Sequence, residues 1–215
     1  LIQDARHEIR DEELKRVLAP RGKIIASEGI RIPHPATPIG NGFVMYTKPV
    51  PSDIDEWTHF LRDASNNAVA QDTKVGPPKH LQWKAGPEYT RDHDALASIS
   101  GVTTSNGRLF YILDEGDTSL MHRPSKWKLI ARDASNGVLL WKRDIPVWIT
   151  QLANFRAGPA QMPRRLVSIG DRVFVTLGLD APVEMLDAAT GKTLRTFVGS
   201  ERTEELIADQ GTLLA

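Results

Sequence analysis

Residues 131–141 read Ala-Arg-Asp-Ala-Ser-Asn-Gly-Val-Leu-Leu-Trp, and they carry the clearest structural pattern of the chain. The residues just before them and the run 138–141 are apolar-rich, as expected of two β-strands. Between the runs, the Asp133 side chain can accept hydrogen bonds from backbone N–H groups two residues further on, and Gly137 can take the positive φ of a tight turn. The stretch therefore predicts the end of one strand, a turn and the start of the next.

The same pattern recurs at residues 186–194, which read Leu-Asp-Ala-Ala-Thr-Gly-Lys-Thr-Leu, and a third copy begins at Asp209. The expected strands are residues 98–104, 108–113, 127–131 and 138–142 in the first copy, and 166–169, 172–176, 183–186 and 194–197 in the second. Four antiparallel strands in about 45 residues are the size of one propeller blade. We therefore expect a mainly β fold, a partial β-propeller of four-stranded antiparallel blades with about two and a fraction present.

The composition excludes several classes of function. With 215 residues, 40% hydrophobic and 25% charged, the chain resembles an ordinary soluble globular protein. Its 27 basic and 27 acidic residues balance, so neither nucleic acid nor an anionic membrane is indicated as a partner. No apolar run reaches the roughly 20 residues that span a bilayer. The lack of cysteine excludes disulfides, thiolate metal ligands and a cysteine nucleophile.

Residues 1–30 have a different pattern. Apolar residues at helical spacing predict an amphipathic helix, and they are Leu14, Val17 and Leu18. Pro20 and Gly22 end it, and residues 23–26 read as a short buried strand. This helix, turn and strand resembles the late part of class I S-adenosylmethionine (SAM)-dependent methyltransferases, although a generic α/β unit has the same pattern. The resemblance implies the C-terminal remnant of a methyltransferase-like α/β domain, whose SAM-binding loop would lie upstream.

Residues 31–52 are rich in proline and glycine, which is a linker composition, with one possible strand at residues 43–47. We place a domain boundary here and the propeller in residues 53–215. A capping box beginning at Asp53, followed by apolar residues on one helical face, predicts a short helix over residues 53–63. Because the chain starts without methionine and stops within a strand-like run, we expect it to be an internal piece of a longer protein.

Two polar clusters are candidate ligand or catalytic sites. Their residues are His59, with Trp57 and Asp63 nearby, and the adjacent Asp92, His93 and Asp94. Carboxylates beside a histidine can hold a metal or tune a general base. A structural histidine and a solvated loop explain the same residues. The Asp-Glu-Gly-Asp stretch at residues 114–117 offers oxygen ligands for a hard cation or is a solvated loop. We assign no catalytic residue, no metal ligand and no cofactor-binding residue from the sequence.

The repeated stretch resembles the tryptophan-docking motif of quinoprotein-type propellers, the fold of pyrroloquinoline-quinone (PQQ) dehydrogenases and of bacterial PQQ-like repeat proteins. The motif residues are Ala131, Asp133, Gly137 and Trp141, and the second copy keeps Asp187 and Gly191 but has Met185 and Arg195 in place of alanine and tryptophan. In that family the aspartate and glycine shape the turn, and the tryptophan packs against a neighbouring blade. Residues 57–63 resemble the tryptophan-led opening segment of such propellers, and residues 81–83 a strand between blades.

The resemblance implies three functions, which the sequence leaves open. In the first, the propeller is a non-catalytic binding or scaffold unit with a protein or carbohydrate ligand, fused to a methyltransferase-like domain. In the second, it is a PQQ-dependent alcohol or sugar oxidoreductase that holds Ca²⁺ through Glu, Asn and Asp, although no residue of this chain matches those positions. In the third, it accompanies a SAM-dependent methyltransferase whose active site lies upstream. Resemblance to quinoproteins favours an extracytoplasmic location.

A ring of this kind normally takes about 4–8 blades, so closure would require the rest of the propeller. Expressed alone, the chain is expected to expose strand edges and to self-associate. Size-exclusion chromatography with light scattering measures this directly. A monodisperse monomer that melts cooperatively would contradict the propeller-fragment hypothesis.

Overall fold

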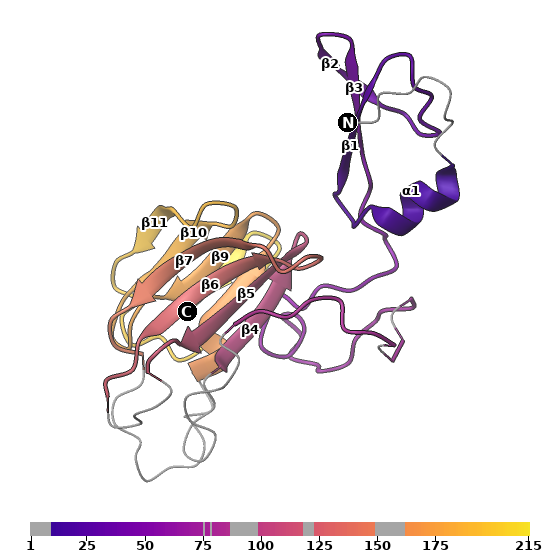
Figure 1. Cartoon of the computed structure of the whole chain (residues 1–215). Coiled ribbons are helices and arrows are strands. Elements are labelled where there is room, and N and C mark those ends of the chain that lie inside the picture. Colours follow the sequence, from indigo (N-terminus) through magenta and orange to yellow (C-terminus); the bar gives the residue numbers. More distant parts are fainter. Residues whose placement is uncertain (1–9, 75, 78, 87–98, 118–122, 149–161) are drawn as a thin grey trace. The chain divides into compact units, whose positions relative to one another are not determined.

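The computed structural model describes residues 10–74, 76–77, 79–86, 99–117, 123–148 and 162–215. The chain divides into two compact units, Leu1–Asp53 and Ile54–Ala215. The first holds the described α-helix and a small sheet, and the second holds the larger sheets (Figure 1). Within the described residues, every pair of neighbouring strands is antiparallel.

The first unit consists of one helix and a three-stranded sheet. The helix α1 spans Asp11–Val17, and the strands β1 (Lys23–Ser27), β2 (Thr37–Gly40) and β3 (Phe43–Thr47) lie in the order β1-β3-β2. The expected helix is therefore present, as are the strands expected at residues 23–26 and 43–47. Acidic residues fill the first turn of α1, where they interact favourably with the positive end of the helix dipole.

The apolar residues of this unit are only partly covered by its described part. The Leu14 side chain is 2% exposed, whereas Val17 on the same helix is 56% exposed. β1 is not the buried strand that we expected, because Ala26 is buried but Ile25 is 51% exposed. One face of the small sheet thus retains apolar side chains in contact with solvent.

The proline- and glycine-rich segment 31–52, which we expected to be a linker, contains β2 and β3. A turn at residues 40–42, with φ angles of +88°, +53° and +73°, joins these two strands. The segment also contacts the helix, because His34 Nε2 lies 2.5 Å from an Asp11 carboxylate oxygen. The His34 ring stacks on Tyr46 with the ring centroids 4.7 Å apart. The segment is thus part of the first unit rather than only a spacer.

The second unit is a partial β-propeller of four-stranded antiparallel blades (Figure 1). The first sheet contains β4 (Ile99–Ser105), β5 (Arg108–Asp114), β6 (Trp127–Asp133) and β7 (Leu139–Ile145). The second contains β8 (Leu166–Ile169), β9 (Arg172–Thr176), β10 (Val183–Asp187) and β11 (Thr193–Phe197), and a 3₁₀-helix, η1 (Met162–Arg165), precedes it. The third has β12 (Ile207–Asp209) and β13 (Thr212–Leu214). Every strand expected in the first two copies is present, which confirms the expected fold class.

The repeated turn has the same hydrogen bonds in both sheets. The Asp133 carboxylate accepts backbone N–H groups two and three residues on, at 2.9 and 3.1 Å, and Asp187 does so at 3.1 and 2.8 Å. The N–H of Gly137 or Gly191 donates to the carbonyl oxygen of the same aspartate, at 2.9 or 2.8 Å. At Asp187 such bonds lower the pKa of the carboxyl, above all the hydrogen bond from the Thr190 hydroxyl.

The strand register repeats along with the turn. Ala131 on β6 pairs with Trp141 on β7, and Met185 on β10 pairs with Arg195 on β11. A register shift follows both pairs immediately, after Ala131 and after Met185, as at a β-bulge. The two copies therefore correspond position for position around the turn. At the position of the tryptophan, the Arg195 guanidinium lies over the Phe197 ring, 4.8 Å from its centroid.

Trp141 connects the first sheet to the turn of the second. Its indole ring lies against Gly191 so closely that a Cβ on this glycine would be 2.6 Å from the ring. The indole Nε1–H donates to the Ala188 carbonyl oxygen at 3.0 Å. Trp141 is 9% exposed, so the contact buries a large aromatic surface and satisfies its polar atom.

Trp83 packs on the turn of the first sheet in the same way. A Cβ on Gly137 would lie 2.6 Å from its ring, and its Nε1–H donates to the Ala134 carbonyl oxygen at 2.9 Å. The strand that we expected at residues 81–83 is wrong, because residues 79–86 belong to none of the described strands. The contact thus depends on the indole ring and the turn, and needs no strand around Trp83.

The second sheet contributes alternate side chains to two different cores, as the two-residue period of a strand requires. One core lies between the first and the second sheet, and its buried residues include Phe110, Ile112, Leu129, Leu166, Val173, Val175 and Leu186. The other core lies between the second and the third sheet, and it contains Val167, Val183, Leu206 and Ala208, with Phe174 and Phe197 packed beside them. The first sheet thereby buries apolar surface against the second, and the second against the third.

The helix expected over residues 53–63 does not form. Residues 58–62 form a tight loop closed by an antiparallel bridge between His59 and Arg62. The expected capping box is absent, because the Glu56 carboxylate instead accepts the N–H of Asn106 at 2.5 Å. Hydrogen bonds to distant strands replace the local helical pattern, which is a weak determinant by itself.

Replacing Gly191 by alanine tests the contact with Trp141. The φ of Gly191 is +70° and a Cβ there would clash with the indole ring, whereas Gly170 has a φ of +55° and no atom within 4 Å of an added Cβ. G170A is therefore the matched control for backbone strain alone. We expect G191A to lower the free energy of unfolding by about 1–3 kcal/mol more than G170A, because of overpacking. Equal losses in urea denaturation of the two variants would contradict the contact.

Candidate functional site

Residues 55–62, which we call the cross-sheet segment, hydrogen-bond to the first strands of neighbouring sheets. The carbonyl oxygen of Trp57 accepts the N–H of Thr104 on β4 at 2.6 Å. The next carbonyl oxygen, of Thr58, accepts the N–H of Ser168 on β8 at 2.9 Å. In return, the Trp57 N–H donates to the Thr104 hydroxyl at 2.8 Å. Two successive residues therefore join two sheets.

His59 extends this pattern to the third sheet. Its Nε2 atom accepts the N–H of Ala208 on β12 at 3.1 Å, across 149 positions of sequence. The first strands converge here, because β8 contacts both β4 and β12. The cross-sheet segment thus follows the edge at which the three sheets approach one another.

An ion pair shapes the cross-sheet segment. The Arg62 side chain is largely buried, and its Nε–H donates to Asp55 at 3.0 Å. Arg62 has a φ of +68°, and its carbonyl oxygen accepts the N–H groups of Thr58 and His59 at 2.7 and 3.1 Å. This strained backbone turns the chain back on itself and closes the loop around residues 58–62.

The imidazole of His59 is buried and uses both of its ring nitrogens. Its Nδ1 atom lies 2.8 Å from the Thr58 hydroxyl oxygen, and that hydroxyl donates to the Arg62 carbonyl oxygen at 3.1 Å. Since the hydroxyl proton points to Arg62, Nδ1 carries the imidazole proton, and Nε2 is the acceptor for Ala208. Burial lowers the pKa of His59 and favours this neutral form. Metal binding or proton transfer would require breaking one of these bonds.

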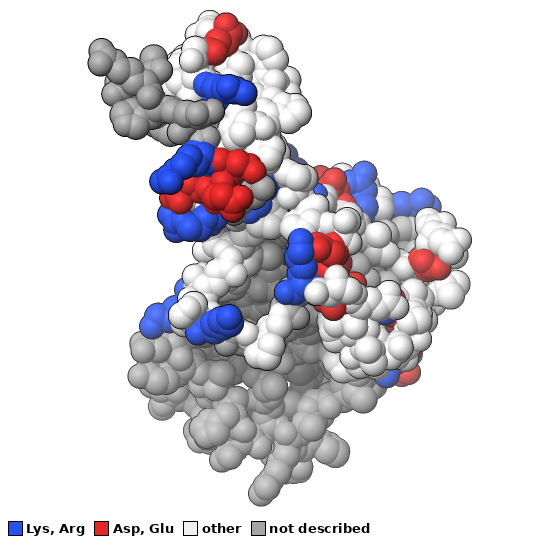
Figure 2. Space-filling view, turned by 90° about the vertical axis from the view of Figure 1, so that its right-hand side faces the viewer, with Lys and Arg blue, Asp and Glu red and all other residues white. Residues whose placement is uncertain are grey.

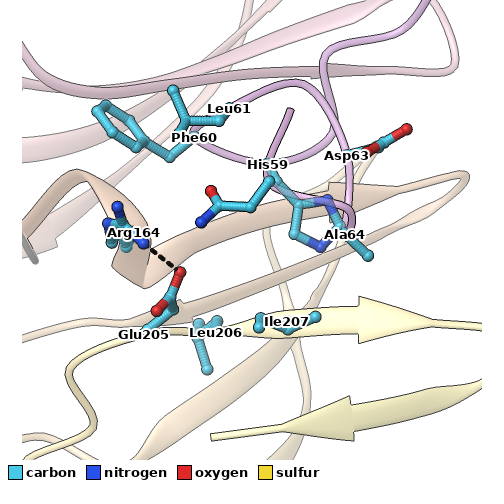
Figure 3. Close-up of a pocket in the computed structure, with 10 residues that line it drawn as sticks. His59, Phe60, Leu61, Asp63, Ala64, Arg164, Glu205, Leu206 and Ile207 are labelled. Atoms are coloured by element: carbon cyan, nitrogen blue, oxygen red, sulfur yellow. Dashed lines mark hydrogen bonds and ion pairs between the residues drawn. The ribbon is translucent and has the colours of Figure 1, made fainter. Parts of the chain in front are cut away.

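A small pocket opens beside His59 (Figure 3). Asp63, Arg164 and Glu205 are among the residues that line it. The Arg164 guanidinium donates to the Glu205 carboxylate at 2.6 Å and closes one side. The cavity volume is about 20 Å³, which is room for about one water molecule. This pocket is therefore too small for an organic cofactor.

The two predicted polar clusters have different outcomes. The residues Asp92, His93 and Asp94 lie outside the described residues. The Asp63 carboxylate accepts the N–H and the hydroxyl of Ser65 at 2.9 and 2.5 Å, and the hydroxyl bond lowers its pKa most. The indole N–H of Trp57 donates to a nearby backbone carbonyl at 3.1 Å. The polar groups of Trp57, His59 and Asp63 thus make separate structural bonds.

The Asp-Glu-Gly-Asp stretch holds its carboxylates in local bonds. Asp114 accepts two backbone N–H groups, at 2.8 and 2.7 Å. Glu115 pairs with Lys142 at 2.5 Å, and Asp117 pairs with Arg123 at 2.9 Å. In the part of the chain that the structure describes, no group of three or more His, Asp or Glu side chains is arranged to hold a metal ion.

Charges of both signs are interspersed on the face of the molecule shown in Figure 2. Ion pairs also bring opposite charges together, and that of Arg108 with Asp171 at 2.8 Å joins the first sheet to the second. Among the described residues, no helix combines the length and the apolar character needed to cross a bilayer.

The sequence singled out His59 but not its partners. Ala208 is a small apolar residue without a chemical signature, and Arg164 and Glu205 belong to no motif. The one available signal was the third copy, whose turn follows Asp209 and places Ala208 on a strand. No protein-family model and no curated protein matches the chain. The function of the chain is therefore inferred from its own residues, above all those of the cross-sheet segment.

Adjacent threonines on β4 test the bond between the cross-sheet segment and the first sheet. The Thr104 hydroxyl accepts the Trp57 N–H, whereas the Thr103 hydroxyl is buried without a hydrogen-bond partner among the described residues. We expect Thr104→Val to lower the free energy of unfolding by about 1 kcal/mol. The isosteric control Thr103→Val should be neutral or stabilising, because it removes a buried unpaired group. Chemical denaturation that ranks the two variants in the opposite order would sink this interpretation.

Proposed function

We propose that this chain is part of a PQQ-like propeller repeat protein whose described blades form a binding or scaffold unit, preceded by a methyltransferase-like segment. The observation that carries the proposal is the cross-sheet segment, which bonds along the converging edge of three sheets. The cross-sheet segment favours a scaffold over a quinone-dependent enzyme, because it already bonds to the first strands of the sheets.

Quinone dehydrogenases of this fold bind their cofactor on the propeller axis, toward which the first strands of the blades face. Here the N–H groups of Thr104, Ser168 and Ala208 on those strands already bond to the cross-sheet segment. A quinone that displaced the segment would break several such bonds, each worth about 0.5–1.5 kcal/mol. The pocket beside His59 has room for about one water, whereas a hollow of about 410 Å³ is lined by Trp57, Phe60 and residues 99–102. The bonds that the segment makes, rather than a lack of space, therefore support the scaffold proposal.

The two tryptophan–glycine contacts support the PQQ-like assignment. Trp83 on Gly137 and Trp141 on Gly191 share the same close approach of 2.6 Å to an added Cβ. In both, the indole N–H donates to the carbonyl oxygen three positions before the glycine. A contact repeated in such detail is what the tryptophan-docking motif requires of successive blades.

The first unit contains the elements on which the methyltransferase-like assignment of the segment before the propeller rests. The helix α1 and the strand β1 follow one another across the turn around Pro20 and Gly22, as in the sequence pattern that resembles this family. We propose no SAM-binding residue in this chain, since the glycine-rich loop of that family would lie upstream.

As a scaffold, the second unit would bind a protein or a carbohydrate through its exposed surface. Val102 and Leu140, 44% and 39% exposed, provide apolar contacts on the first sheet. An extracytoplasmic location follows only from the resemblance to quinoproteins. Nucleic acid is not proposed as a partner, because basic and acidic residues are equal in number.

Titration with PQQ and Ca²⁺ tests the proposal. We expect no saturable change in tryptophan fluorescence or calorimetric heat at micromolar PQQ, because the converging edge is already occupied. Ca²⁺ alone and PQQ with a chelator are the controls, and SAM titrated in parallel is also expected not to bind. Saturable, Ca²⁺-dependent PQQ binding with a micromolar or tighter Kd would contradict the scaffold proposal and favour the oxidoreductase.

A further inference from the structure

The bond between His59 and Ala208 can exist in only one protonation state of the imidazole. Nε2 accepts the Ala208 N–H, while Nδ1–H donates to the Thr58 hydroxyl, whose own proton points to the Arg62 carbonyl oxygen. A second proton on the ring would bind to Nε2, because this nitrogen has the remaining lone pair. Two donors, Nε2–H and the Ala208 N–H, would then face each other at 3.1 Å.

We propose that His59 is a pH-dependent latch, which holds β12 and β13 on the converging edge when neutral and releases them when protonated. Three features of the geometry carry this inference. His59 is 6% exposed, its Nε2 accepts a hydrogen bond from a backbone N–H, and that donor lies on the third sheet. Besides this bond, β12 and β13 are held by apolar contacts of Leu206, Ala208 and Leu213 with the second sheet, which do not depend on the imidazole.

Charged groups from several elements lie near the ring. Asp63, next to the cross-sheet segment, together with Glu205 and Asp209 at β12, favours the imidazolium. Arg62 bridges to His59 within the loop and is paired with Asp55 and Asp63, and Arg164 from η1 lines the same pocket, where it is paired with Glu205. Burial is the largest influence, and the pKa of His59 in the folded chain is below its ordinary value.

The sign of the pH effect follows from this lowered pKa. When the latch opens, the imidazole becomes solvated and its pKa returns to about 6.5. The open form then binds the proton more readily than the closed form, so falling pH favours opening. The stabilising bond is fully present above about pH 6.5 and weakens between that pH and the lower pKa of the closed form.

Release need not unfold the rest of the second unit. The N–H of Leu206, the residue before β12, still donates to the Arg164 carbonyl oxygen at 3.0 Å, and the Arg164–Glu205 ion pair at 2.6 Å is kept. These contacts precede β12 in the chain and do not involve the imidazole. We therefore expect a local opening at Ala208, while strand β5 of the first sheet stays closed.

Amide hydrogen exchange of the full chain between about pH 7.5 and 5 tests the latch, with each rate corrected for the intrinsic effect of pH. Protection of the Ala208 amide should fall by up to about tenfold per pH unit below pH 6.5, as expected for uptake of one proton. Protection of Ile112, which is buried on β5, should stay constant and thereby exclude global unfolding.

His59→Gln is the decisive variant, because its side-chain oxygen can replace Nε2 as an acceptor but does not titrate. We expect His59→Gln to keep Ala208 protected at pH 7 and to abolish the pH dependence, and His80→Gln, at an exposed position, to behave as the parent. The latch is falsified if Ala208 protection in the parent is independent of pH, or if His59→Gln retains the same decrease. Either result leaves the PQQ titration unaffected, so the two proposals fail separately.

Discussion

An indole ring packed against a position that has no Cβ is the contact on which the second unit depends. Two constraints require glycine at positions 137 and 191: the backbone has a positive φ, and an indole ring lies where a Cβ would be. On the first sheet, Trp141 makes this contact from the last strand, whereas β4 approaches β8 from the opposite edge. Two attachments at opposite edges, with an apolar core between them, leave the second sheet little freedom to rotate against the first.

The cross-sheet segment solves a different problem, that of unpaired strand edges. The first strand of each sheet presents N–H and C=O groups that no strand of its own sheet can satisfy. Trp57, Thr58 and His59 satisfy one such group on each of three sheets, although they belong to no strand themselves. The same residues therefore protect the edges from other chains and fix the distances between sheets. Within the described residues, the polar groups of Trp57, His59 and Asp63 all take part in hydrogen bonds that hold the fold.

Local patterns in the sequence predicted what local physics determines. The turns at Asp133 and Asp187 and the strands beside them followed from turn chemistry and from two-residue alternation, which need no distant partner. The helix expected at residues 53–63 was wrong because its apparent capping residue, Glu56, bonds to the turn between β4 and β5, far along the chain. The partner of His59 was unpredictable for the same reason, since the backbone N–H of an alanine leaves no trace in residue type.

The separation of His59 and Ala208 has a consequence for biosynthesis. A ribosome makes the cross-sheet segment long before β12, which follows it by nearly the whole second unit. Contacts between such distant positions form slowly, because a long stretch of chain loses entropy when its ends meet. The nascent segment must therefore wait with unpaired polar groups while blades accumulate beyond it. Chaperones should bind the nascent chain most during this interval, while the polar groups of the cross-sheet segment are unpaired. A pause in translation after Ala208 would give the bond to His59 time to form before more chain is added.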